Sequence, residues 1–354
     1  MWQSDPAYEE TEKLIKRIEK RITEEYTQAE GELTSKLNDY LGKFQTKDEI
    51  WQRWVRDGEK TEEEYKKWRT GQIAIGKRWE ETRNSISQDL INANHMAQSI
   101  VRGHIPEAYA LNHDYATYEI EHGAMVDTSY SLYSRQTAER VFRENPQMLP
   151  NPGRKVSQDI ADGLASRWNN NQIQSVMIQG LLQGESIPKL AKRLRETVGD
   201  SNRKASIRNA RTMMTGAQNA GRLDAMRRAN EMGVKTRKQW MATLDMRTRH
   251  WHRELDGVIV DVDEPFENEY GEIMYPGDTN ADPANIYNCR CKAVPVLEGF
   301  EDDMSDISWR HNKNLGDMTY EEWKREKGKS QPITRQEDVG NRIRMRYIND
   351  YRRR

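Results

Sequence analysis

Cysteine is nearly absent from this chain of 354 residues, in which Cys289 and Cys291 are the only two. Two neighbouring cysteines do not make the disulfide framework of a small secreted domain, so we expect a reducing compartment. The N-terminal stretch lacks the apolar core of a signal peptide, and no apolar run approaches the ~20 residues that cross a bilayer. We therefore expect a protein that is made in a cytoplasm and stays soluble.

Apolar residues are also scarce. Hydrophobic residues make up 35% of the chain and charged residues 32%, and the mean hydropathy is -1.04. A single globule of this size normally buries far more apolar surface, so the composition favours long helices, small cores and contacts with partners. Phenylalanine occurs 4 times against 10 Trp and 15 Tyr. These amphipathic rings suit either half-wet interfaces or ordinary helix packing.

The net charge of -1 excludes no class of partner, but the charges are separated along the chain. Residues 185–254 hold 17 Lys and Arg against 7 Asp and Glu, residues 256–306 hold 2 against 14, and residues 335–354 hold 7 against 3. Such separation can steer a polyanion to one face, although charged runs more often form solvated surfaces. The sequence leaves both interpretations open.

One long helix is predicted near the N-terminus. Apolar residues recur every three or four positions from residue 14 to residue 44, which places them in one stripe along a helix. One stripe needs one partner surface, either from the rest of the chain or from another subunit. The stripe consists of Leu14, Ile18, Ile22, Tyr26, Ala29, Leu33, Leu37, Leu41 and Phe44.

Two further helices are predicted in the first part of the chain. Thr61 and Glu64 form a capping box that opens one of them. Another is expected over residues 80–101, where apolar residues again recur with helical spacing. Gly103 and Pro106 are expected to stop this helix, because proline removes a backbone donor and clashes with the preceding turn.

The character of the sequence changes after residue 201. A long basic helix is followed by short extended pieces, at 239–244, 258–262 and 289–297, which glycine and proline separate. The fold class is therefore a mainly α-helical N-terminal region followed by a small α+β module. A Pro-rich break at 149–153 and these changes predict four segments: a helical N-terminal arm (1–150), a helical connector (151–201), the α+β module (202–299) and a polar, basic tail (300–354).

Residues 240–291 carry a specific set of motifs. Trp240 is followed by Asp245-Met-Arg-Thr-Arg249-His-Trp-His252, then by Leu255-Asp256-Gly257, and finally by Asn288-Cys289-Arg290-Cys291. This set resembles the core of the Mu F-like head-morphogenesis family of phage minor head proteins. The likeness extends upstream through Ala210-Arg211-Thr212. Many relatives have an acidic residue directly after that Arg-Thr pair, where this chain has Met213, so any chemistry of that acid would be lost here.

The resemblance implies a minor head (minor capsid) protein of the virion that acts in head morphogenesis, DNA packaging or DNA delivery without catalysis. The implied partner is the portal protein, with capsid protein, scaffolding protein and DNA as further candidates and no membrane. The implied location is the head interior or portal vertex, and the host cytoplasm during assembly. The family-motif residues would form a structural core: Trp240, Asp245, Arg249, His252, Asp256, Gly257, Asn288, Cys289, Arg290 and Cys291.

Residue chemistry predicts how this module closes. In extended geometry, Cys289 and Cys291 share one face, and Arg290 faces the other side, toward a partner or toward Asp245. Asp245 and Arg249 are expected to brace one loop through an ion pair. The central prediction is that the Asp/Arg/His turn folds back against the Cys-x-Cys segment.

A zinc site is the main chemical alternative. His252, Cys289 and Cys291, with His250 as a further candidate, are ligand types that Zn²⁺ favours, although Cys-x-Cys spacing is unusual for structural zinc. The plainer interpretation is a pair of buried thiols packed beside a hydrogen-bonded histidine. A metal-dependent, nuclease-like module that uses the same three residues is a weaker alternative, because the only later histidine, His311, lies in the polar tail.

Contact with DNA or with the portal is a second open question. Arginines on the basic helix would meet phosphates without reading bases, or would pair with acidic groups. No Gly-rich phosphate loop is present, and residues 278–289 fail as a calcium loop because Pro283 and Cys289 stand where Gly and Glu are needed. The candidates for contact are Arg203, Arg208, Arg211, Arg222, Arg227 and Arg228, together with the tail arginines Arg342, Arg344, Arg346, Arg352, Arg353 and Arg354.

Overall fold

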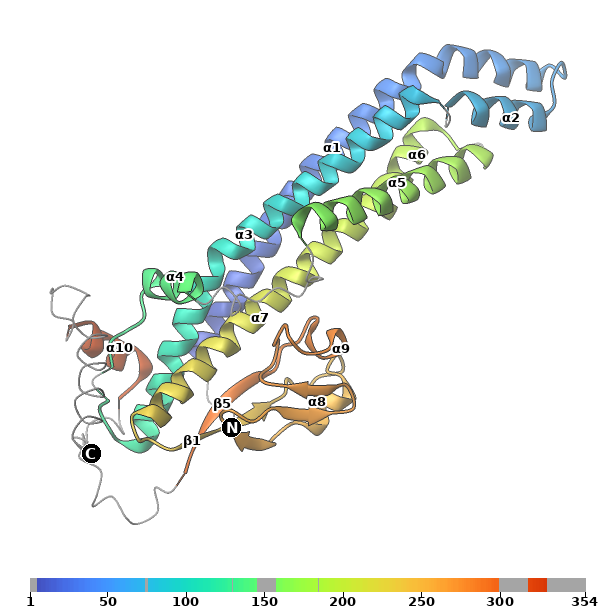
Figure 1. Cartoon of the computed structure of the whole chain (residues 1–354). Coiled ribbons are helices and arrows are strands. Elements are labelled where there is room, and N and C mark those ends of the chain that lie inside the picture. The colour runs from blue at the N-terminus through green and yellow to red at the C-terminus, as the bar shows by residue number, and fades with distance from the viewer. Residues whose placement is uncertain are drawn as a thin grey trace.

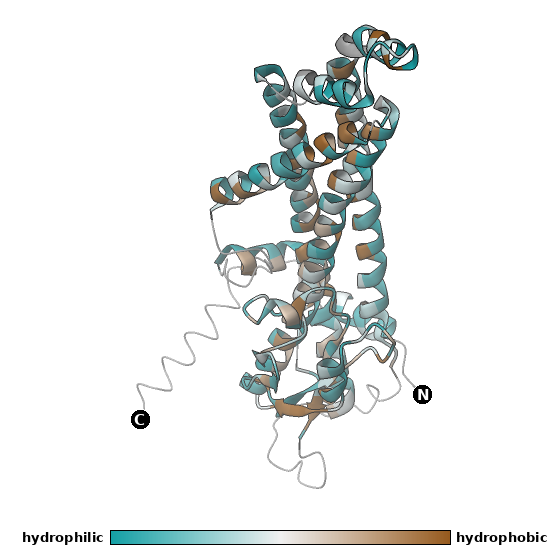
Figure 2. Ribbon diagram, turned by 90° about the vertical axis from the view of Figure 1, so that its right-hand side faces the viewer, coloured by the Kyte–Doolittle hydropathy of each residue, from teal (hydrophilic) through white to brown (hydrophobic). Residues whose placement is uncertain are grey.

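Long helices form most of the molecule. The computed structural model describes residues 5–73, 76–128, 130–144, 157–183, 185–298 and 318–329. Figure 1 shows an elongated helical stalk that carries a small β-module at one end. The predicted fold class, a mainly α-helical chain with a small α+β module in its C-terminal part, is confirmed. Figure 2 shows hydrophilic residues along much of the stalk, as the low hydrophobic content requires.

The predicted N-terminal helix is confirmed as α1 (Pro6–Arg56). The carboxylate of Asp5 caps it by accepting a hydrogen bond of 2.9 Å from the backbone N–H of Tyr8. The stripe from Leu14 to Leu41 is buried in a core that it shares with α3 and α7, so its partner surface comes from the same chain. The side chain of Phe44, the last predicted member, lies outside the described residues.

The second predicted helix, α2 (Glu62–Ile73), begins at the expected capping box. The N–H of Glu64 donates to the Thr61 hydroxyl at 3.1 Å, and the N–H of Thr61 donates to the Glu64 carboxylate at 3.0 Å. The predicted stop near Pro106 is wrong, because α3 runs without interruption over Lys77–Ala124. Proline inside a helix costs about 3 kcal/mol. Burial of Ile105, Pro106 and their neighbours against α1 and α7 offsets that cost.

The remaining helices complete the stalk. Helices α4 (Arg135–Glu144) and α5 (Gln158–Leu182) pack on α3. Helix α6 (Ile187–Leu194) continues through the π-helical turn η2 (Arg195–Gly199) into α7 (Asp200–Glu231). Helices α3 and α7 approach so closely at Gly221 that an added Cβ would lie 2.3 Å from the carbonyl oxygen of Tyr109. The last described helix, α10 (Tyr320–Lys329), packs on α3.

The β-module follows α7. Strand β1 (Thr236–Met241) pairs with β2 (Ile259–Asp261) on one side and with β5 (Lys292–Leu297) on the other, both antiparallel. The module also contains a hairpin of β3 (Phe266–Asn268) and β4 (Gly271–Ile273), and the short helices α8 (His250–Glu254) and α9 (Pro283–Ile286). The hairpin was not predicted, because strands of three residues carry too little periodicity to detect.

One hydrophobic core runs through α1, α3, α5, α6 and α7, and a smaller core fills the β-module. Residues from both sides of positions 150 and 201 share the first core, so the predicted division of the chain into segments remains a prediction. All of the predicted break at 149–153 and most of the tail at 300–354 lie outside the described residues.

A buried acid in α3 makes the stability of this end of the stalk depend on pH. Asp114 accepts hydrogen bonds from the Tyr130 hydroxyl at 2.7 Å and from the backbone N–H of Tyr133 at 2.9 Å. Burial raises the pKa of Asp114 to about 7, although these bonds and Lys324 lower it in part. The folded chain therefore keeps the Asp114 proton up to a pH of about 7, whereas the unfolded chain releases it with a pKa of 3.8. The free energy of unfolding consequently falls as the pH rises from about 4 to about 7.

Asp114→Asn is expected to remove this contribution, because the amide keeps an acceptor oxygen and carries no charge. The variant should be more stable than the wild type at about pH 8 and should lose that advantage at about pH 4. Urea unfolding followed by circular dichroism at both pH values measures the difference. Asp159→Asn makes the same chemical change at an exposed position of α5 and serves as the control. An equal effect of Asp114→Asn at the two pH values would contradict the prediction.

Candidate functional site

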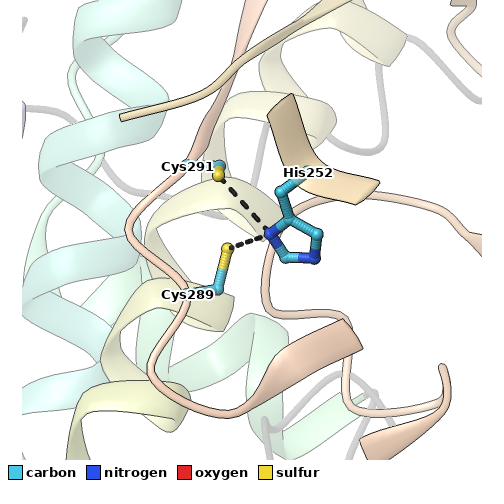
Figure 3. A group of neighbouring side chains, drawn as sticks. All are labelled: His252, Cys289 and Cys291. Atoms are coloured by element: carbon cyan, nitrogen blue, oxygen red, sulfur yellow. Dashed lines mark hydrogen bonds between the residues drawn. The ribbon is translucent and has the colours of Figure 1, made fainter. Parts of the chain in front are cut away.

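The motif residues converge in the core of the β-module. Trp240 of β1 is fully buried, and His252 projects from α8 into the same core as Cys289 and Cys291. Figure 3 shows the ring of His252 beside the two thiols, with one ring nitrogen, Nδ1, turned toward both sulfurs. This Nδ1 atom lies 3.6 Å from each Sγ atom. The central prediction, that the Asp/Arg/His turn folds back against the Cys-x-Cys segment, is confirmed.

The predicted ion pair between Asp245 and Arg249 is wrong. The guanidinium group of Arg290 donates to both carboxylate oxygens of Asp245, and one of these bonds measures 2.7 Å. These hydrogen bonds hold the pKa of Asp245 well below its usual range. Arg249 instead donates to the backbone carbonyl of Tyr287. The Asp245 carboxylate also accepts the N–H of Arg247 at 2.9 Å, which fixes the loop with its acid facing the Cys-x-Cys segment.

The Cys-x-Cys segment lies just before β5 rather than inside a strand. Asn288 has a φ of 55°, in the left-handed region, and this turns the chain before the first cysteine. Three consecutive carbonyl groups then accept hydrogen bonds from side chains of α7 and of the loop after β1. The bonds run from Thr215 to Cys289 at 3.0 Å, from Thr243 to Arg290 at 2.8 Å and from Asn219 to Cys291 at 3.3 Å.

Helix α7 contributes side chains whose contacts the sequence did not predict, although Thr212 and Asn219 lie in the stretch over which the family resemblance extends. Asn219 also accepts the N–H of Ala293 at 2.8 Å and donates to the carbonyl of Pro276 at 3.0 Å, so one side chain holds β5 and the loop before α9. Thr212 accepts the N–H of Asn288 at 3.2 Å. The available signal was the spacing of Thr212, Thr215 and Asn219 along one face of a helix otherwise rich in Ala, Gly and Met.

The His252, Cys289 and Cys291 side chains are 2%, 3% and 2% exposed, and their ligand atoms all lie within 4.8 Å of one another. The hydrogen bond between the thiols lowers the pKa of Cys291 and raises the pKa of Cys289. The His252 ring lowers the pKa of Cys291 further. His250, the further candidate ligand, lies outside this group and is exposed beside Glu269 at 2.9 Å. These three side chains could serve as ligands of one metal ion. Their burial leaves no access for a polymeric substrate.

The candidate contact arginines of α7 do not form one open face. Arg222 has no exposed surface and lies among acids of α1 and α3, so the prediction that it contacts DNA or the portal is wrong. Arg208 and Arg228 lie over the rings of Tyr287 and Tyr133, at 4.7 and 5.1 Å from the ring centres. The others pair with acids: Arg203 with Asp200, Arg211 with Glu19 and Arg227 with Asp263. The tail arginines lie outside the described residues.

No described helix combines the length and the apolar composition that a bilayer span requires. Residues 171–294 match the family described as Phage Mu protein F like protein. The match begins within α5 and ends within β5, so it contains the whole motif set. No solved structure matches the chain.

Three curated proteins are similar to parts of the chain. Minor head protein GP7 of Bacillus phage SPP1 is 35% identical over 163 residues, which are 44% of this chain and 51% of GP7. NAD(+)–arginine ADP-ribosyltransferase EFV of Enterococcus faecalis is 30% identical over 178 residues, 49% of this chain and 35% of that protein. An uncharacterized protein of Haemophilus influenzae is 26% identical over 207 residues, 58% and 40% of the two chains. The chain thus spans about half the length of these relatives or less.

The closed α+β module and its motif set lie in the part of the chain that the family match covers, and this part is a Mu F-like module. The chain therefore carries a Mu F-like region over residues 171–294, and part of it is similar to a phage minor head protein.

Proposed function

We propose that this chain is a minor head protein that associates with the portal protein inside the procapsid and acts in head assembly, DNA packaging or DNA delivery without catalysis. The observation that carries the proposal is the complete Mu F-like motif set, closed into one buried core at the end of a long polar stalk. The similarity to a protein named as a minor head protein supports it. A stalk with so much polar surface offers a long face for protein contacts.

Burial of the only Cys/His cluster in the described residues argues against the nuclease-like alternative. A nuclease must bring a phosphate to its metal, and His252, Cys289 and Cys291 are almost completely covered. The transferase activity in the name of the enterococcal relative belongs to a protein of which this chain covers 35%. No contact among the described residues favours that activity here.

A stripe on α5 is the first surface to test for a portal contact. Ile160, Leu164 and Trp168 recur at every fourth position of this helix, and they are 55%, 40% and 43% exposed. Adjacent exposed apolar side chains on one helix face are typical of protein interfaces, whereas single ones are common on any surface. DNA is a weaker candidate partner, because the arginines of α7 already have contacts within the chain.

The test is co-purification of the full-length chain with the portal protein of the same phage after their joint expression. We expect the wild-type chain to carry portal protein with it, and the double variant Leu164→Asp/Trp168→Asp to lose at least about 90% of it, since hot-spot aromatic residues commonly contribute 2 kcal/mol or more. Asn171→Asp adds a charge at an exposed site of the same helix without removing an apolar group, and should have little effect. Recovery of wild-type chain free of portal protein would count against the proposed function. Loss of binding in Asn171→Asp as well would count only against the stripe.

A further inference from the structure

The strongest unassigned feature of the molecule is the buried cluster of one imidazole and two thiols. We propose that His252, Cys289 and Cys291 bind one zinc ion through Nδ1 and the two Sγ atoms, and that this ion fastens α8 to the segment before β5. The inference concerns the integrity of the β-module and does not rest on portal binding.

The distances fit a tetrahedral ion. Zn–S bonds of about 2.3 Å and Zn–N bonds of about 2.0–2.1 Å, at tetrahedral angles, place a sulfur about 3.6 Å from a nitrogen bound to the same ion. Both Sγ atoms lie 3.6 Å from the one Nδ1 atom of His252. The three ligand atoms stay within 4.8 Å of one another, so a single ion can reach them all.

Hydrogen bonding alone accounts poorly for the burial of His252. A neutral imidazole has one N–H, and sulfur is a weak acceptor, so at most one good donor faces two thiols. The second ring nitrogen, Nε2, is buried and makes no hydrogen bond within the described part of the chain. Burial of a poorly bonded polar ring is unfavourable, and a bond from Nδ1 to a metal would offset that loss.

The ligands are held in place by their surroundings, as a metal site requires. The carbonyl groups of Cys289 and Cys291 are fixed by Thr215 and Asn219 of α7, and the ring of His252 packs edge-to-face on Trp240 with the ring centres 5.2 Å apart. Cys-x-Cys spacing is compatible with this geometry because the segment is bent before β5 and both thiols face His252 (Figure 3).

The donor set selects the metal. Two thiolates and an imidazole favour Zn²⁺ over Mg²⁺ or Ca²⁺, which take oxygen ligands. The described residues supply three ligands, so a water molecule or another small donor would complete the tetrahedron. Because the ligands come from two segments 37 to 39 residues apart, binding of the ion would stabilise the closed module.

The experiment measures metal content in the purified full-length chain, prepared without chelators from cells grown with zinc. We expect about one zinc per wild-type chain, and less than about a tenth of that in His252→Gln. His250→Gln is the matched control: His250 lies two positions away on the same helix, is exposed, and should leave the zinc content unchanged. Equal loss of zinc in both variants would overturn the assignment of ligands.

Cobalt provides a second readout that does not require a variant to fold. After removal of zinc from the wild-type chain, titration with Co²⁺ should produce a thiolate-to-cobalt charge-transfer absorption that saturates at about one equivalent. The absorption should be absent in Cys289→Ser/Cys291→Ser. A helical wild-type chain that contains no zinc and shows no such absorption, or one in which the two cysteines are joined in a disulfide, would refute the proposal.

Discussion

Replacement of Arg222 by methionine is expected to lower the free energy of unfolding by about 3–5 kcal/mol, the typical effect of breaking a buried ion pair from one side. Arg222 is completely buried. It donates to Asp5 at 2.6 Å, to Glu119 at 3.4 Å and to Asn112 at 3.1 Å. Asp5 also accepts a hydrogen bond of 2.7 Å from Lys292. One guanidinium group therefore joins the start of α1, the C-terminal part of α3 and α7, and the network extends to the start of β5.

The charges left behind explain the size of this effect. Burial by itself would raise the pKa of Asp5, but Arg222 and Lys292 outweigh it and keep that pKa below its usual value. Burial raises the pKa of Glu119 to about 7 even beside Arg222. Without the guanidinium group, at least one buried carboxylate would lose its main counter-charge at neutral pH.

Two further variants separate charge from packing. Arg222→Lys keeps the charge but loses the forked geometry, so its stability should fall between wild type and Arg222→Met. Arg222→Met/Glu119→Gln removes the carboxylate left without a counter-charge, while Asp5 keeps Lys292, and should recover more than half of the loss. Chemical unfolding followed by circular dichroism measures all of these. If Arg222→Met lies within about 0.5 kcal/mol of wild type, the network does not stabilise the stalk.

Arg222 also shows where sequence reasoning stops. The basic residues around it in the sequence predict a contact with DNA or with the portal. Its actual partners, Asp5 and Glu119, lie 217 and 103 residues away. Pairing over that separation depends on how α1, α3 and α7 pack, and no pattern within one helix records it. Asp245 differs: it pairs with Arg290, which the Cys-x-Cys pattern offered as one of two alternatives, and only the predicted pair with the nearer Arg249 is wrong.

Local signals were sufficient elsewhere. The stripe of α1 and the capping box at Thr61 predicted elements that the structure contains, because spacing and capping act within one or two turns. The prediction from Pro106 was wrong because proline is unfavourable inside a helix only locally. Burial in the tertiary structure outweighs this local effect, and the helix continues. The convergence of His252 with Cys289 and Cys291 was predicted from the motif set, while the α7 side chains that hold the segment were not.

Trp240→Ala is expected to open the β-module and to leave the stalk folded. Truncation of a buried tryptophan typically lowers the free energy of unfolding by about 3–5 kcal/mol. The Trp240 ring is fully buried and packs edge-to-face on His252 and on Phe266, with centres 5.2 Å away in both cases. These contacts lie in the core of the module, which is separate from the core of α1, α3 and α7. The loss should therefore be local.

Hydrogen exchange resolves this local effect. Amides of β1 and β5 should exchange at least about 100-fold faster in Trp240→Ala, since 1.4 kcal/mol corresponds to a factor of ten, while amides in the middle of α1 should be unchanged. Trp251→Ala is the control, because Trp251 belongs to the neighbouring helix α8 but is only partly buried and lies outside the core of the module. Equal acceleration in the module and in α1 would mean that the two cores unfold together. In that case the Mu F-like module would not fold separately from the stalk. Every role proposed for the module alone would then have to be assigned to the whole chain.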